Sequence, residues 1–171
     1  AGDRVLSTQS TFDWTPEMTG GWIQATFDLV AGRDTAPYVG YFIALRDFND
    51  ARQLSGGNIL FDGAAAGQAG VHVDYPGADS LGRGKIGTSG YTPGRNYGVR
   101  VTNLGDDRFE LRQMVDGVPE DGAVTFAAAD LPDGAFGFEY CCGRSYVVDN
   151  VLIETGVPDA KLDGEARKLA E

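Results

Sequence analysis

Residues 96–117 read NYGVRVTNLGDDRFELRQMVDG, and this stretch decides the fold class. Apolar and polar residues alternate through Tyr97–Thr102 and again through Arg108–Val115. Such alternation is typical of β-strands that turn one face toward a core and the other toward solvent. The residues between the two runs, Asn103–Asp107, are of types that favour tight turns. The stretch therefore predicts an antiparallel hairpin with one buried face.

The same pattern continues along the chain in both directions. Runs of β-branched and aromatic residues, bounded by Gly, Pro, Asp or Asn, predict further short strands, and no helical period interrupts them. In Tyr38–Asp47, for example, alternation puts Val39, Tyr41, Ile43 and Leu45 on one face, opposite Tyr38, Phe42 and Arg46. We therefore predict an all-β, two-sheet antiparallel sandwich. Its predicted strands are Arg4–Thr8, Trp22–Val30, Tyr38–Asp47, Asn58–Phe61, Gly70–Asp74, Gly84–Gly87, Tyr97–Thr102, Arg108–Val115, Val124–Ala127, Ala135–Cys141 and Ser145–Glu154.

The length of 171 residues suits one domain. We assign residues 1–157 to the sandwich and 158–171 to a charged, alanine-containing tail that predicts a short helix or a linker. The chain begins at Ala1 without a methionine, so we expect a mature or excised piece of something larger. The longest apolar runs are far shorter than a membrane span, which argues against membrane insertion.

Charge and cysteine usage narrow the function classes. Fourteen Lys and Arg against 25 Asp and Glu give 14 − 25 = −11, which argues against nucleic acid or an anionic membrane as a partner. Cys141 and Cys142 are adjacent, and bridge geometry fits poorly across one peptide bond. No Cys/His spacing typical of zinc sites occurs.

Two stretches resemble the concanavalin A-like, laminin G-like family of jelly-roll modules. One is the 96–117 hairpin, which opens on a tyrosine and ends in Asp-Gly. The other is Gly134–Tyr140, followed after a tight turn by Val147–Glu154 with its Asp-Asn-Val sequence. The resemblance implies one convex and one concave sheet, carbohydrate bound on the concave face, and structural calcium near Asp149. It also implies an accessory domain of a larger secreted or periplasmic bacterial protein, with neighbouring domains as further partners.

The resemblance also implies which side chains would meet a glycan or polysaccharide. If the strands pair as in the family, polar residues from several strands share the concave sheet, where planar hydrogen-bonding groups suit sugar hydroxyls. Aromatic residues would supply flat apolar surfaces for pyranose rings. Trp14 and Trp22 are instead predicted to be core residues, with exposure of either ring on a rim as the alternative. The predicted ligand-binding residues are Arg46, His72, Asp74, Lys85, Arg100, Glu139, Phe42 and Tyr91.

No catalytic residue is assigned. The Glu-x-Asp-x-x-Glu strand of family glycanases is absent, and the lyase strands are matched only by fragments, Arg108-Phe109-Glu110 and Lys85-Ile86-Gly87. His72 is the single histidine, so it would have to be the general base for any nucleophile that a histidine activates. Three functions stay open: a non-catalytic, lectin-like carbohydrate-binding module, a hydrolase or lyase with other catalytic residues, and a structural or protein-interaction spacer.

Overall fold

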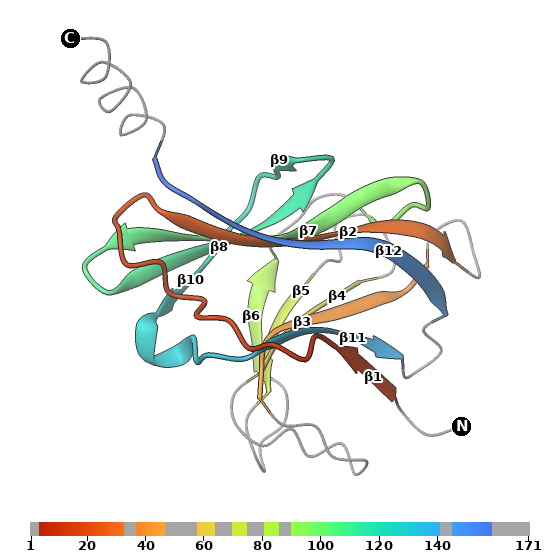
Figure 1. The fold of residues 1–171 in the computed structure, drawn as a ribbon, viewed down its shortest axis with the longest axis horizontal. Coiled ribbons are helices and arrows are strands. Elements are labelled where there is room, and N and C mark those ends of the chain that lie inside the picture. Colours follow the sequence, from red (N-terminus) through yellow and green to blue (C-terminus); the bar gives the residue numbers. More distant parts are fainter. Residues whose placement is uncertain are drawn as a thin grey trace, which may run out of the picture.

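The structure, a computed structural model, describes residues 4–32, 37–46, 58–63, 70–74, 81–85, 90–140 and 145–158. Two antiparallel sheets lie face to face (Figure 1). Sheet I has the order β1 (Arg4–Ser7), β11 (Ala135–Tyr140), β3 (Val39–Leu45), β4 (Asn58–Gly63), β5 (Gly70–Asp74) and β6 (Leu81–Lys85). Sheet II has the order β10 (Val124–Ala127), β8 (Arg108–Val115), β7 (Arg95–Gly105), β2 (Trp22–Gly32) and β12 (Tyr146–Gly156), with β9 (Val118–Pro119) also paired to β8. The predicted two-sheet antiparallel sandwich is confirmed.

The predicted hairpin forms β7 and β8. Tyr97 pairs with Val115 and Val101 with Leu111, so the apolar members of both strands face the same side. The turn follows from local chemistry, because Gly105, Asp106 and Asp107 all have positive φ, a region that Gly and Asp tolerate better than most residues. The short strand β9, which directly follows the predicted Asp116-Gly117 end of the hairpin, was not among the predicted strands.

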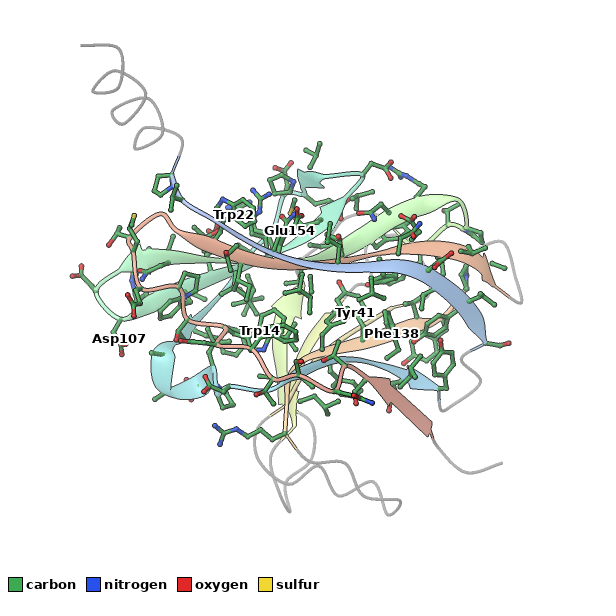
Figure 2. The ribbon with its side chains drawn as sticks, in the orientation of Figure 1. Trp14, Trp22, Tyr41, Asp107, Phe138 and Glu154 are labelled. Carbon is green, nitrogen blue, oxygen red and sulfur yellow. The ribbon has the colours of Figure 1, made fainter. Side chains whose placement is uncertain are left out.

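The core lies between the sheets and is rich in aromatic rings (Figure 2). Phe27 of β2 is fully buried and meets Tyr41 and Phe138 of sheet I edge-on, at centroid distances of 5.2 and 5.0 Å. Edge-to-face contacts of this kind add to the stabilisation from burial. The Tyr41 hydroxyl donates a hydrogen bond to the Gly98 carbonyl across the sandwich at 3.1 Å. Burial raises the pKa of Tyr41, so the hydroxyl keeps its proton for this bond.

A β-bulge in β3 overturns part of the predicted alternation. Phe42 pairs with Gly137 and Leu45 with Ala135, so one extra residue of β3 lies between these pairs. The backbone accommodates the extra residue at Ala44, which has φ 54°. Leu45 therefore lies on the same face as Phe42, with its Cδ2 3.0 Å from the position of a Cβ at Gly137. The prediction that Leu45 shares the core face with Tyr41 is wrong.

Two other predictions lie outside the described residues. These are the state of Cys141 and Cys142 and the helical or linker character of the tail beyond Pro158. Among the described residues, no helix has the length and apolar character needed to cross a membrane.

Candidate functional site

The outer face of sheet I, opposite the core, carries most of the predicted ligand-binding residues. The backbone register puts Phe42 opposite Leu60 and Leu60 opposite His72. Asp74 is two positions from His72 and pairs with Asn58. A second row crosses the sheet two positions away from Phe42. In this row Gly40 pairs with Asp62, Asp62 with Gly70, and Gly70 with Lys85.

Glu139 extends this second row on the other side of Gly40. Phe138 pairs with Tyr41, so the next position on β11 falls beside Gly40. The register therefore gives one face of sheet I to Phe42, His72, Asp74, Lys85 and Glu139.

Two of the predicted aromatic contacts are corrected by burial. Phe42 is fully buried, although it lies outside the core cluster, so its ring offers no exposed surface. Tyr91 is a core residue, only 1% exposed, and packs edge-on against Tyr97 at 4.9 Å and Tyr41 at 6.5 Å. Both were assigned from residue type, which does not distinguish an aromatic ring on a groove from one that fills space beside the core.

Arg46 and Arg100 lie apart from each other. Arg46 is exposed just after β3, and its Nε donates a hydrogen bond to the Asp133 carbonyl at 2.9 Å. Arg100 belongs to β7 and hence to sheet II, so the prediction that it shares a sheet with His72 and Lys85 is wrong. Alternation shows which residues of a strand share a face, but it does not show which sheet the strand joins.

Arg100 is the centre of a polar row on the outer face of sheet II. Its guanidinium lies 4.4 Å from the centroid of the Trp22 ring and donates two hydrogen bonds, of 3.0 and 2.7 Å, to the Gln24 side-chain oxygen. The Gln24 amide nitrogen donates in turn to Glu154 of β12 at 2.9 Å. Next to Arg100 in register is Arg112, which forms an ion pair with Glu110 at 2.6 Å. These contacts cross four adjacent strands.

Sequence reasoning missed this row. The structure corrects the prediction of Trp22 as a core residue, because the ring is half-buried on the outer face. The ring lies over Gly156 of β12, where a Cβ would come within 2.1 Å of its Cζ2. The alternation Trp22, Gln24, Thr26 in β2 was the available signal, because it puts Trp22 on the polar side of that strand.

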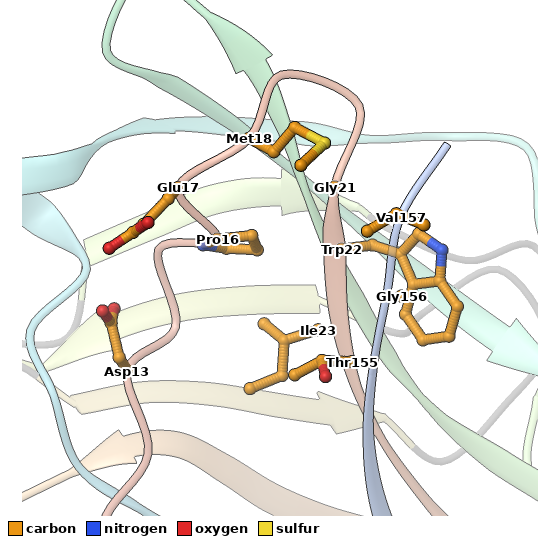
Figure 3. Close-up of a pocket in the computed structure, with 10 residues that line it drawn as sticks. All are labelled: Asp13, Pro16, Glu17, Met18, Gly21, Trp22, Ile23, Thr155, Gly156 and Val157. Carbon is orange, nitrogen blue, oxygen red and sulfur yellow. The ribbon is translucent and has the colours of Figure 1, made fainter. Parts of the chain in front are cut away.

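A pocket of about 620 Å³ opens beside Trp22, between the segment before β2 and the end of β12 (Figure 3). Ile23 and Val157 contribute apolar walls, and Asp13 and Glu17 line the pocket from the segment before β2. Its volume falls within the range of small-ligand pockets.

The surroundings of Asp149, the predicted calcium ligand, favour hydrogen bonding within the chain. Asp149 is exposed, and its Oδ1 accepts the Asn150 backbone N–H at 2.8 Å. The Asn150 side chain donates to Asp28 at 2.7 Å, and Asn96 donates to the other Asp28 oxygen at 2.8 Å. Among the described residues, no group of three or more His, Cys, Asp or Glu could hold a metal. Calcium at Asp149 stays a prediction.

The hydrogen bonds from Asn150, and secondarily from Asn96, lower the pKa of Asp28. A carboxyl whose pKa is lower in the folded state stabilises the fold above its unfolded pKa, and this contribution is lost as pH falls through the folded pKa. We therefore expect Asp28→Asn to weaken the acid dependence of stability below about pH 4. Urea unfolding at pH 3 and pH 6 measures this. The expectation would be contradicted if the free energy of unfolding changed between pH 6 and pH 3 by as much in Asp28→Asn as in the unsubstituted protein.

Solved structures of other proteins share this architecture. Neither a protein-family profile nor a curated protein sequence matches the chain. The carbohydrate-binding module CBM66 from Bacillus subtilis matches 90% of this chain and 82% of its own length, at 14% identity and a TM-score of 0.51. The carbohydrate recognition domain of Emp47p matches 91% of this chain and 79% of its own length, at 16% identity and a TM-score of 0.51. The chain therefore has the concanavalin A-like jelly-roll fold that the hairpin and the last two strands predicted.

Proposed function

We propose that this chain is a non-catalytic carbohydrate-binding module that binds a glycan or polysaccharide on the outer face of sheet I. The observation that carries the proposal is the register of β4, β5 and β6, which puts His72, Asp74 and Lys85 in neighbouring rows on the face opposite the core. Amine, imidazole and carboxylate groups on one face can donate to and accept from the hydroxyls of a sugar. The fold adds support, because both similar structures are named for carbohydrate binding.

Glycan arrays and polysaccharide pull-downs with the full chain test the proposal. We expect Lys85→Ala to weaken binding by about tenfold or more, because a hydrogen bond to a charged group contributes roughly 1.5–3 kcal/mol. His72→Ala should weaken binding by a smaller factor, because an ordinary hydrogen bond contributes roughly 0.5–1.5 kcal/mol. Arg46→Ala tests the end of β3 in the same way. Arg100→Ala is the matched control, since it removes a cationic side chain from the other sheet.

The outcomes separate the remaining alternatives. Binding that survives His72→Ala and Lys85→Ala but is lost in Arg100→Ala would move the site to sheet II and contradict the proposal. An absence of binding across the panel would favour a structural spacer. Release of new reducing ends from any bound polysaccharide would show a hydrolase or lyase. Repeating the screen with calcium and with chelator tests the structural ion at Asp149.

A further inference from the structure

The pocket beside Trp22 is separate from the proposed glycan site. None of the described residues that line it lies on sheet I, whose outer face carries His72, Asp74 and Lys85. Its volume of about 620 Å³ is within the range of small-ligand pockets, and apolar atoms form most of its walls. The volume and the walls therefore suit the apolar body of a small organic molecule.

The two sides of this pocket differ in charge. Asp13 and Glu17 lie on one side, and Trp22 lies on the other (Figure 3). The Arg100 guanidinium lies 4.4 Å from the centroid of the Trp22 ring, so a positive charge is already present on that side. Among the described residues that line the pocket, none is Lys, Arg or His. A cationic group is therefore attracted to the two carboxylates, and an apolar group to the opposite wall.

Hydrogen bonds hold the segment that carries the two acids. Asn103 of β7 donates from its side-chain nitrogen to the Pro16 carbonyl at 2.6 Å, and the Asn103 backbone N–H donates to the Gly21 carbonyl at 2.9 Å. The Asp13 Oδ1 accepts the Thr15 backbone N–H at 2.8 Å, which fixes the direction of that carboxylate. This wall of the pocket is therefore formed before a ligand arrives, so binding requires little further ordering of the chain.

We propose that this pocket binds a small organic amine, with the ammonium group at Asp13 and Glu17 and the apolar body against Ile23 and Trp22. An ammonium group has three N–H donors, which two carboxylates can accept together. Among the described residues, none donates a hydrogen bond to the Glu17 side chain or forms an ion pair with it, so the ligand supplies its charge partner. A ligand with a carboxylate or phosphate group would instead meet two negative charges.

Isothermal titration calorimetry of the full chain with hexylamine, 1-hexanol and hexanoate, at neutral pH and low ionic strength, tests this proposal. The three probes share one apolar chain and differ in charge. We expect hexylamine to bind about threefold or more tighter than 1-hexanol, because an exposed ion pair contributes a factor of up to about five. Hexanoate should bind most weakly. Butylamine should bind several-fold more weakly than hexylamine, because it buries two fewer methylene groups.

Two double variants test the charged side of the pocket. Asp13→Asn/Glu17→Gln should remove the preference for hexylamine over 1-hexanol. Asp106→Asn/Asp107→Asn is the matched control, because it neutralises two exposed acids of the turn between β7 and β8, outside this pocket. The control separates a specific site from the general attraction of cations to a chain with a formal charge of −11. Far-UV circular dichroism checks that both variants are folded.

The apolar side of the pocket is tested by Trp22→Ala. This variant should weaken the binding of hexylamine and of 1-hexanol by similar factors, because it removes an apolar wall and keeps both carboxylates. The proposal would be overturned if hexylamine gave no heat of binding at millimolar concentrations, or if it bound no tighter than 1-hexanol. A loss of hexylamine binding in Asp106→Asn/Asp107→Asn as large as in Asp13→Asn/Glu17→Gln would overturn it as well.

Discussion

Replacing Gly98 with alanine is expected to unfold the domain or to lower its free energy of unfolding by more than about 4 kcal/mol. Gly98 lies in the middle of β7, between Thr26 of β2 and Met114 of β8. A Cβ at this position would lie 2.1 Å from the Ala25 carbonyl oxygen and 2.8 Å from the Thr26 Cα. These are backbone atoms, so no side-chain rotation can relieve the clash, and β2 and β7 would have to separate. Urea unfolding followed by circular dichroism measures the loss.

The matched control is a glycine whose added methyl group meets nothing. Gly94 has φ 88°, and no atom lies within 4 Å of its Cβ position. Gly94→Ala should therefore cost only the strain of a left-handed backbone, about 1–2 kcal/mol. If Gly98→Ala were no less stable than Gly94→Ala, the tight contact between β2 and β7 would be contradicted. The pair separates two effects, because a substitution at Gly98 meets backbone atoms and one at Gly94 meets only a left-handed backbone conformation.

The parts of the fold that could be predicted are those set by residues close to each other in the sequence. Alternation through β7 and β8, with the turn residues between them, was enough to predict a hairpin and one buried face. The bulge in β3 was not predictable in this way. Ala44 carries no local signal for a positive φ, and it is the pairing of β3 with β11 that makes room for an extra residue. One such residue moves Leu45, the last residue of β3, to the other face of the sheet.

In the candidate site, too, local placement could be predicted and long-range placement could not. His72 and Asp74 could be put on one face because they are two positions apart on a single strand. Arg100 was assigned to the wrong sheet because sheet membership depends on long-range pairing, here of β7 with β2. Trp22 shows that residue type alone does not decide whether a side chain lies in the core. An aromatic residue in an alternating strand suggested core, but the hydrogen-bonded row of Gln24, Arg100 and Glu154 on the outer face gives the indole polar neighbours there.

The two tryptophans are therefore expected to differ in how strongly they stabilise the fold. Trp14 is fully buried, and its Nε1 donates a hydrogen bond to the Gly134 carbonyl at 3.0 Å. The same carbonyl accepts the Phe12 backbone N–H at 2.9 Å, and the Phe12 and Trp14 rings meet edge-on at 5.9 Å. The ring thus ties the segment before β2 to the start of β11. We expect Trp14→Ala to lower the free energy of unfolding by about 3–5 kcal/mol, the usual cost of deleting a buried aromatic ring.

Two further variants separate packing from hydrogen bonding. Trp14→Phe keeps a buried ring but removes the donor to Gly134, so it should cost less than Trp14→Ala, about 1–3 kcal/mol. Trp22→Ala removes a half-buried ring and its contact with Arg100 and should cost about 2 kcal/mol at most. Urea unfolding followed by far-UV circular dichroism compares all three without relying on tryptophan fluorescence. A Trp22→Ala variant as unstable as Trp14→Ala would show that the Trp22 ring, too, holds the sheets together, and the contrast between an inner and an outer tryptophan would fail.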